Sequence, residues 1–374
     1  MEVRKRMLII HPALAPYRID FFNHLHEYFN VKLLLINDNI SDNPFNQFEL
    51  RNNLKFEKKL IENVFKIGNR TVPYNFISEI RDYNPEIIIC SEFSLVNNLV
   101  LLYRILLNKH FKIFTLTDDN QFMIHKPGSL LRRLNKDLIC RLIDGIITVD
   151  IPEVYDYYKE KIKGNNVIGV HHLVRDKGIF KKQLLIARKE DFSFELYSNK
   201  KKLLFVGRLL HQKGIDILFE VFSEVVKIQS DLVLFIVGEG SERSNLEGLI
   251  KKLNLVKFVC MEGRKEGIEL LKYYVLCDLF ILPSRFEVFG AVVNEALVAG
   301  LPVICSDQVG AKCLINEGLN GSIFNLDDNN TFLNSLNYWL SKIDKSNKII
   351  DKEALTTIDV KVEVEKLAEF LKYN

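Results

Sequence analysis

The chain has 374 residues, of which 48% are hydrophobic and 26% are charged. Its length allows two domains of roughly 150 residues, and its composition excludes disorder or a coiled coil along the whole chain. The longest strongly apolar stretch, residues 99–107, is interrupted by Arg104 and is shorter than the roughly 20 residues that cross a membrane. The apolar run at residues 7–10 is too short for a signal peptide, so we expect a cytoplasmic protein.

Charge is distributed unevenly between the two halves of the chain. Residues 1–200 hold 30 Lys and Arg against 24 Asp and Glu, whereas residues 201–374 hold 21 against 24. A basic N-terminal half suits an anionic surface or acceptor. We expect no nucleic-acid partner, because no basic cluster with interleaved aromatic residues occurs in the sequence.

Short aliphatic runs alternate with helical patterns along the chain. In the first half we expect strands at residues 8–11, 31–36, 86–90, 112–117 and 145–149, and helices at 18–29, 95–107 and 130–143. In the second half we expect strands at residues 202–207, 232–238, 257–260, 279–283 and 302–306, and helices at 215–228, 290–299, 331–343 and 360–373. This alternation predicts an α/β protein with parallel sheets covered on both faces. Apolar residues in the segment 170–199 follow neither a clear helical nor a clear strand period, and we expect the connection between two domains there.

The first candidate site follows the strand expected at residues 202–207. Gly207 and Arg208 begin the turn to the next helix, and Lys213 ends it. Ligands of open parallel sheets bind beyond the carboxyl ends of the strands, and two cations beside a helix N-terminus suit a diphosphate. For either cation alone, a solvated turn is the simpler interpretation. The hypothesis requires both cations to converge on one pyrophosphate, and a permanent salt link to a neighbouring acid would contradict it.

The second candidate site lies around the strand expected at residues 279–283. Glu287 lies in a loop that begins at Pro283 and ends at Gly290, where backbone amides can face a ligand. Glu295 lies on the following helix, whose other residues are almost all apolar, so we expect its carboxylate to be partly buried. Burial of an unpaired carboxylate is costly, so Glu295 should have hydrogen-bond donors from the protein or from a ligand's hydroxyl groups.

A third, weaker motif is Gly238-Glu239-Gly240 after the strand expected at residues 232–238. Two glycines allow close approach of a ligand to the backbone, although such a sequence is usually only a tight turn. Arg243 stands where the dinucleotide fingerprint would have its last glycine, so NAD binding is not favoured.

Together these motifs resemble the donor-binding domain of retaining GT-B glycosyltransferases of the family-4 type (glycosyl transferases group 1). The matching residues, in the family's order, are Gly207-Arg208-Leu209, Lys213-Gly214, Gly238-Glu239-Gly240, 283–290, Glu295-Ala296-Leu297 and 300–304. The resemblance covers residues 201–312 and is weak in the N-terminal half. It implies two Rossmann-like domains whose parallel sheets face each other across a cleft. These would be an acceptor-binding domain at residues 1–185, a nucleotide-sugar-binding domain at 186–357, and a C-terminal helix at 358–374 that packs back on the first domain.

The resemblance also implies roles for the site residues. Arg208 and Lys213 would hold the donor diphosphate, Glu295 the ribose and Glu287 the transferred sugar. The base would lie near Glu262-Gly263-Arg264. The donor-binding residues would be Gly207, Gly238, Gly263, Arg264, Val288, Phe289, Gly290 and Glu295. No metal is expected, because the two cations can neutralise the diphosphate. A UDP-sugar is favoured over a GDP-sugar by its frequency in the family.

The N-terminal half departs from the commonest family pattern. Many relatives have a glycine-rich loop after the first strand, whereas residues 11–18 here read His-Pro-Ala-Leu-Ala-Pro-Tyr-Arg. Relatives often place a His or Asp after a central strand, facing the reaction centre. The candidate here is Asp118, or its neighbour Asp119, and the alternative is that an aspartate caps the next turn.

The resemblance implies transfer of a sugar to a hydroxyl of a glycan or lipid-linked glycan, with retention, in the synthesis of a surface polysaccharide such as lipopolysaccharide. Two alternatives stay open: a nucleotide-sugar epimerase or hydrolase, and a non-catalytic subunit that binds nucleotide sugars. A lipid-linked acceptor would bring the N-terminal domain to the inner face of the membrane. The helix expected at residues 130–143 carries Arg132, Arg133, Lys136 and Arg141, although a solvated helix face is the simpler interpretation of those charges.

Overall fold

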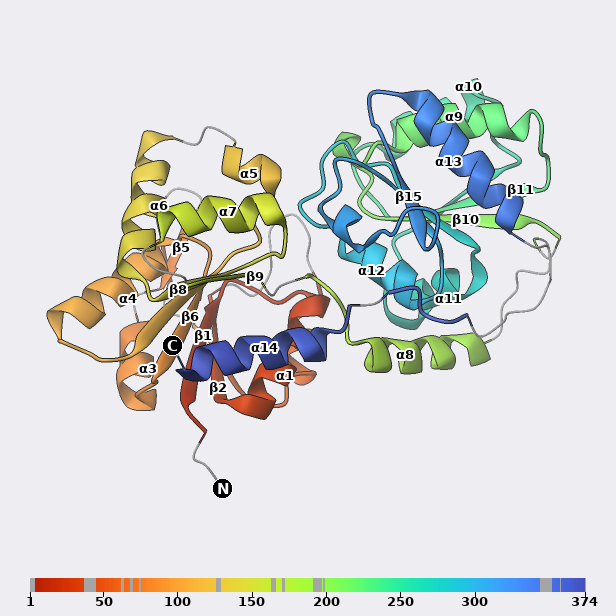
Figure 1. Ribbon diagram of the computed structural model, residues 1–374. Coiled ribbons are helices and arrows are strands. Elements are labelled where there is room, and N and C mark those ends of the chain that lie inside the picture. The colour runs from red at the N-terminus through yellow and green to blue at the C-terminus, as the bar shows by residue number, and fades with distance from the viewer. Residues whose placement is uncertain are drawn as a thin grey trace. The chain divides into compact units, whose positions relative to one another are not determined.

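The computed structural model describes residues 4–36, 45–61, 64–67, 70–73, 75–125, 129–162, 166–169, 172–190, 197, 199–343, 352–356 and 358–373. The chain divides into two compact units (Figure 1). The N-terminal unit comprises residues 1–176 together with 359–374, and the C-terminal unit comprises residues 177–358. Each unit is built on its own parallel sheet.

The N-terminal unit has a seven-stranded sheet in the order β3-β2-β1-β6-β7-β8-β9, and every pairing in it is parallel. The strands are β1 (Arg6–His11), β2 (Asn30–Leu35), β3 (Glu57–Leu60), β6 (Ile87–Ser91), β7 (Lys112–Leu116), β8 (Gly145–Thr148) and β9 (Val167–Gly169). A separate antiparallel hairpin consists of β4 (Val64–Ile67) and β5 (Arg70–Pro73). All five expected strands of this half are confirmed. The edge strand β3 was missed because its sequence, EKKL, has no apolar run.

Helices cover both faces of this sheet. They are α1 (Pro16–Tyr28), α2 (Gln47–Asn52), α3 (Phe76–Tyr83), α4 (Leu95–Leu106), α5 (Gln121–His125), α6 (Leu130–Leu142), α7 (Pro152–Lys161) and α14 (Val360–Tyr373). The C-terminal helix α14 packs along α1 (Figure 1). Val364, Leu367 and Leu371 are buried on one side of it, the spacing of a core-facing helix. The expected return of this helix to the first domain is confirmed.

The C-terminal unit has a six-stranded parallel sheet in the order β12-β11-β10-β13-β14-β15. Its strands are β10 (Lys201–Val206), β11 (Leu232–Val237), β12 (Val259–Gly263), β13 (Leu279–Leu282), β14 (Val303–Ser306) and β15 (Gly321–Phe324). Its helices are α8 (Lys177–Lys189), α9 (Ile215–Val226), α10 (Arg243–Lys252), α11 (Gly267–Leu276), α12 (Ala291–Val298) and α13 (Asn329–Lys342), with 3-10 turns η2 (His211–Lys213) and η3 (Gly310–Leu314). Strand β11, with the sequence LVLFIV, is buried along its whole length, as expected for a strand covered on both faces.

The expectation of an irregular connection at residues 170–199 is wrong for α8. This helix packs against α11 and α12, and its buried residues Phe180, Leu184 and Ala187 follow a helical period that the neighbouring lysines obscured. The units therefore divide between Asp176 and Lys177, nine residues before the boundary expected from the sequence. Among the described residues, no helix is long and apolar enough to cross a membrane.

Candidate functional site

The strand order of the C-terminal sheet reverses between β10 and β13. Strands β11 and β12 follow β10 toward one edge of the sheet, and strands β14 and β15 follow β13 toward the opposite edge. In open α/β sheets ligands bind beyond the carboxyl ends of the two strands at such a reversal. The turn after β10 contains residues 207–214, and the loop after β13 contains residues 283–290. The topology therefore brings together two motifs that are distant in the sequence.

A glycine allows the turn and the loop to approach each other closely. Gly214 has a φ of +66°, and a Cβ atom there would lie 2.0 Å from the carbonyl oxygen of Pro283. Only a residue without a side chain fits this conformation and this space. The approach places Lys213 beside residues 283–290.

Lys213 and Glu287 form an ion pair between Nζ and Oε2. Both side chains are largely buried, with exposed fractions of 12% and 16%. Sequence analysis assigned both residues to one site, and the structure does place them in contact. Sequence analysis assigned Lys213 to a diphosphate, however, on the condition that no acidic side chain forms a salt bridge with it. The structure does not meet this condition. A carboxylate holds Lys213 where the hypothesis places phosphate.

Arg285 ties the loop after β13 to the start of α9. Its Nη1 and Nη2 atoms donate to the two carboxylate oxygens of Asp216, each at 2.7 Å, and Nη1 also donates to the carbonyl oxygen of His211 at 2.9 Å. Burial alone would raise the pKa of Asp216, but the hydrogen bonds and charge of Arg285 lower it below its usual value. Sequence analysis missed this interaction, the Arg285 clamp. Both partners could be read from the sequence, since Asp216 lies in the first turn of α9 and Arg285 lies in the loop after β13.

We expect Arg285→Gln to lower the free energy of unfolding by about 1 kcal/mol at pH 7, because both side chains are only partly buried. Since the pKa of Asp216 is lowered from 3.8, the pair stabilises the fold above that pH and ceases to do so as the pH falls through the lowered pKa. Urea titrations of both proteins should therefore converge in strongly acid solution. Lys227→Gln, which removes an exposed pair with Glu224 at the end of α9, is the control. Equal stability of wild type and Arg285→Gln at pH 7 would contradict the clamp.

The glycines predicted to bind the donor lie at neighbouring strand ends. The Gly207 amide donates to the Val237 carbonyl at 3.0 Å, and the Gly238 amide donates to the Gly263 carbonyl at 2.8 Å. Gly238 has a φ of +150°, and a Cβ atom there would lie 1.8 Å from the carbonyl oxygen of Gly207. The first glycine of the weak Gly-x-Gly motif is therefore needed because the backbone segments that follow β10 and β11 cross closely at this point.

Glu295 lies on α12 and is partly buried, as expected. Its Oε2 atom accepts a hydrogen bond of 2.9 Å from the hydroxyl of Tyr274 on α11. The expectation that this carboxylate has a donor is confirmed, and at least one donor is a protein group.

The remaining donor-binding candidates differ in their surroundings. The Phe289 side chain is buried, and its carbonyl accepts from the Ala311 amide at 2.6 Å. Val288 is partly buried, and Gly290, the N-cap residue that precedes α12, has a φ of +92°. Arg264 is exposed, and its Nε atom donates to the carboxylate of Glu266 at 2.8 Å.

In the N-terminal unit, Asp118 follows β7. It accepts a hydrogen bond of 2.5 Å from the Nη2 atom of Arg18, whose side chain is only 3% exposed. Asp119 is buried, pairs with Lys136 at 2.6 Å and accepts from the Tyr158 hydroxyl. These partners of the two aspartates are side chains of α1, α6 and α7.

Asn120, the next residue, provides capping interactions. Its side chain accepts from the amides of Phe122 and Met123 at 3.1 and 3.0 Å. The structure also adds Glu92, which follows β6 with a φ of +57° and accepts from the Thr117 hydroxyl at 3.2 Å. Sequence analysis missed Glu92, although it directly follows an expected strand.

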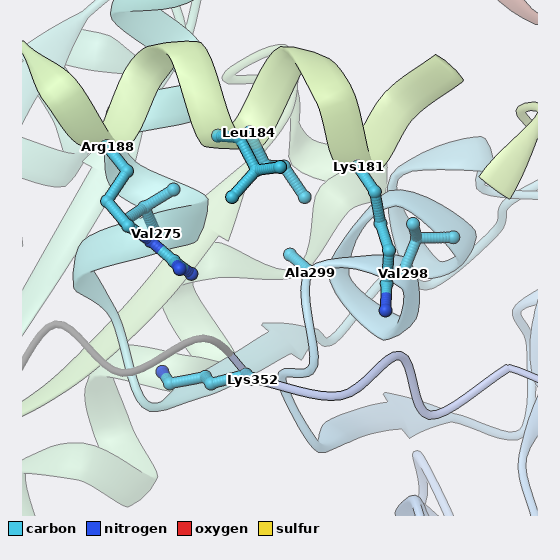
Figure 2. A pocket seen from close by; sticks show the side chains of 8 residues that line it. Lys181, Leu184, Arg188, Val275, Val298, Ala299 and Lys352 are labelled. Atoms are coloured by element: carbon cyan, nitrogen blue, oxygen red, sulfur yellow. The ribbon is translucent and has the colours of Figure 1, made fainter. Parts of the chain in front are cut away.

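A small cavity of about 50 Å³ lies elsewhere in the C-terminal unit (Figure 2). Among its lining residues, Leu184 and Arg188 come from α8, and Val275 from α11. The Nζ atom of Lys352 donates to the Cys277 carbonyl, and burial lowers the pKa of Lys352. The cavity is far smaller than the 300–1,000 Å³ of a typical small-molecule site, and none of its lining residues belongs to the candidate site. In the described part of the chain, no group of three or more His, Cys, Asp or Glu residues could hold a metal ion.

Residues 187–355 match the family model of the glycosyl transferases group 1. The match includes the turn after β10, the loop after β13 and Glu295. Most of the C-terminal unit is therefore similar to this family. The Lys213–Glu287 pair, the Arg285 clamp and the crossing at Gly238 all lie within the matched residues.

The relatives of this chain align over part of their length. An uncharacterized glycosyltransferase of Methanocaldococcus jannaschii is 36% identical over 129 residues, 34% of this chain and 33% of that protein. The N-acetylgalactosamine-N,N'-diacetylbacillosaminyl-diphospho-undecaprenol 4-alpha-N-acetylgalactosaminyltransferase of Campylobacter jejuni is 32% identical over 174 residues, 46% of each chain. The chain thus spans between a third and a half of the length of these curated relatives.

The fold of the chain is similar to solved structures over its full length. The crystal structure of Anabaena HepE in complex with UDP matches with a TM-score of 0.73 and 16% identity, covering 99% of this chain and 100% of that one. At this identity the likeness shows the fold. The two parallel-sheet units and the returning C-terminal helix constitute the GT-B architecture, so the expected fold class is confirmed.

Proposed function

We propose that this protein is a glycosyltransferase that moves a sugar from a nucleoside diphosphate sugar to a hydroxyl of a glycan or lipid-linked glycan, with retention of configuration. The observation that carries the proposal is the contact between Lys213 and Glu287 at the reversal of strand order, within the residues that match the glycosyl transferases group 1. A cation for phosphate and a carboxylate for sugar hydroxyls are adjacent there. Arg208 begins the same turn and would add the second cation.

The chemistry of such a site consists mainly of stabilising the leaving group. As the bond from the anomeric carbon to phosphate breaks, negative charge grows on the diphosphate. Fixed cations and amide dipoles lower the barrier by meeting that charge. We assign this role to Arg208 and Lys213, with the amides of Phe289 and Gly290. The acceptor hydroxyl attacks from the face that the diphosphate leaves, and a departing phosphate oxygen takes its proton, so no protein nucleophile and no metal ion is required.

Because Lys213 is paired with Glu287, we propose that the donor binds in two steps: the diphosphate first displaces Glu287 from Lys213, and the sugar then binds to Glu287. A diphosphate carries more charge than one carboxylate and competes with it for the ammonium group. Once Lys213 turns to the phosphate, the Glu287 carboxylate can accept from hydroxyls of the sugar. Glu295, already held by Tyr274, would accept from the ribose, and Gly263 and Arg264 would lie beside the base. Asp118, held by Arg18, is the proposed residue of the N-terminal domain at the reaction centre.

This exchange predicts opposite effects of Glu287→Gln on two measurements. Affinity for UDP should rise about fivefold, because Lys213 loses a charged competitor worth about 1 kcal/mol. Sugar transfer should fall, because an amide holds sugar hydroxyls less strongly than a carboxylate does. Isothermal titration with UDP and a transfer assay test the two effects. Glu224→Gln, which removes an exposed partner of Lys227 on α9, should change neither, and weaker UDP binding by Glu287→Gln would contradict the exchange.

The donor is proposed to be a UDP-sugar. Anabaena HepE, which shares the fold, was solved in complex with UDP, and a 33% identical relative over 144 residues is named as a GDP-mannose-dependent enzyme. A panel of nucleoside diphosphate sugars in a thermal-shift assay decides between the bases. A ligand at 100 times its dissociation constant adds roughly 2.7 kcal/mol of stability.

The acceptor is proposed to be a glycan of a surface polysaccharide such as lipopolysaccharide, carried on a lipid. The name of the Campylobacter relative includes a diphospho-undecaprenol, a lipid-linked acceptor. Such an acceptor places the enzyme on the cytoplasmic side of a membrane, with the N-terminal domain in contact with it. Incubation with donor alone is the deciding control. Rapid conversion without acceptor would favour an epimerase or hydrolase, and tight binding without turnover on any acceptor would favour a non-catalytic subunit.

A further inference from the structure

Two neighbouring helices of the N-terminal unit expose an unusual number of aliphatic side chains. Six of them, which we call the apolar face, are each at least half exposed: Leu102, Ile105 and Leu106 on α4, and Leu131, Leu134 and Leu138 on α6. Within each helix they are three or four residues apart or adjacent, so they form one stripe per helix. Isolated surface leucines are ordinary, but grouped stripes mark interaction sites.

The core does not account for these stripes. The opposite side of α4 buries Val96, Val100 and Leu101, and the opposite side of α6 buries Ile139 and Cys140. Each helix is therefore already anchored on the sheet side. The stripes are additional apolar surface that the N-terminal unit leaves exposed.

The two stripes flank one junction between the helices. The side-chain amide of Asn98 on α4 donates to the side-chain oxygen of Asn135 on α6 at 2.8 Å. Leu102 follows Asn98 by one helical turn, and Leu138 follows Asn135 by nearly one turn. Residues three or four apart share a helix face. Leu102 and Leu138 therefore lie next to the Asn98–Asn135 contact on their helices, and the two stripes form one surface there. The two helices are in contact, and Figure 1 shows them as neighbours in the N-terminal unit.

The charges around the apolar face are positive. Arg132, Arg133 and Arg141 on α6 are exposed, as is Lys109 just after α4, and within the described residues none of these four forms an ion pair. The sequences of the two helices contain a single acid, Asp137, whose carboxylate pairs with Lys161 at 2.5 Å. The rim is therefore complementary to an anionic partner.

We infer that the apolar face binds the surface of a membrane rich in anionic phospholipids, with α4 and α6 lying along the interface. Leucine side chains enter the boundary of the acyl chains, and the arginines meet the phosphate headgroups. Helices of 12 and 13 residues are too short to span a bilayer but suit this orientation. The six residues include no aromatic side chain, whereas protein interfaces depend on Tyr, Trp and Phe. This inference rests on the proposed membrane-bound acceptor and specifies the surface that makes the contact.

Sedimentation with vesicles tests the inference on the full-length protein. We expect binding to vesicles of phosphatidylcholine with one third phosphatidylglycerol, and little binding to phosphatidylcholine alone. Arg132→Gln/Arg133→Gln should weaken partitioning about tenfold or more, because each cation near an anionic surface contributes. Leu131→Gln/Leu134→Gln/Leu138→Gln should abolish it. The matched control is Ile228→Gln, which changes a 92% exposed residue of the other unit and should leave partitioning unchanged.

Three outcomes would overturn the inference. These are absence of wild-type binding to the anionic vesicles, full binding by the leucine variant, and a dimer in solution that the leucine variant converts to a monomer. The last would identify the apolar face as an interface between two copies of this chain. UDP titrations of the same variants should match wild type, since the substitutions lie in the other unit from the donor site. Loss of vesicle binding with normal UDP binding is thus distinguishable from failure of the proposed donor site.

Discussion

Lys213→Ala and Arg208→Ala should each lower the rate of sugar transfer at least tenfold, which corresponds to about 1.4 kcal/mol in the activation free energy. In the proposed site, each change removes a cation from the position assigned to the leaving diphosphate. Since the charge on that diphosphate is larger in the transition state than in the bound donor, the loss should affect kcat as well as KM. Steady-state kinetics with the donor that gives the largest thermal shift measures both.

Lys213→Ala has a structural side effect that needs its own control. It leaves the Glu287 carboxylate, which is only 16% exposed, without its cation, and this costs stability. The double variant Lys213→Ala/Glu287→Ala removes both charges and should recover stability without recovering transfer. Lys227→Ala, on the exposed end of α9, should leave transfer unchanged. Near-wild-type turnover by folded Lys213→Ala or Arg208→Ala would refute the assignment of these cations.

Gly238→Ala should destabilise the C-terminal unit by about 3 kcal/mol, among the larger effects of single substitutions. A methyl group at this residue would lie 1.8 Å from the carbonyl oxygen of Gly207, and the backbone φ is +150°. The two strand ends would have to separate, so UDP affinity should fall together with stability. Urea denaturation and UDP titration of the same preparation measure both effects.

Gly248→Ala is the matched control for that substitution. Gly248 lies inside α10, and a Cβ atom there would have no neighbour within 4 Å. Alanine is the better helix former, so this variant should gain about 0.5–1 kcal/mol. If the two substitutions have the same effect on stability, the close crossing of backbones at Gly238 is wrong.

The alternation of aliphatic runs and helical patterns was sufficient to predict the fold class. All ten expected strands are present, because a buried parallel strand needs an apolar run of its own. The charged edge strand β3 was missed because it lacks this signal. Helix α8 was missed for a related reason. Its three buried residues recur with a helical period, but lysines between them obscured the pattern.

The candidate site was predictable as a set of residues but not as a set of contacts. Glycines and charged residues at strand ends identified the turn after β10 and the loop after β13. That Lys213 pairs with Glu287, 74 residues away, depends on the order of strands in the sheet. The same holds for the clamp between Arg285 and Asp216, since neither partner alone differs from an ordinary surface charge.

The sequence by itself therefore determined the two α/β halves, their strands and the motifs at the strand ends, since these follow from the chemistry of residues close together in the chain. Tertiary structure alone decided which motifs meet at the reversal between β10 and β13, and which acid holds Lys213. It also decided that the leucines of α6 point away from the sheet, although their spacing is equally compatible with a core-facing helix. The physical reason is that periodicity defines the faces of an element, whereas its neighbours determine which face is buried and which charges are paired.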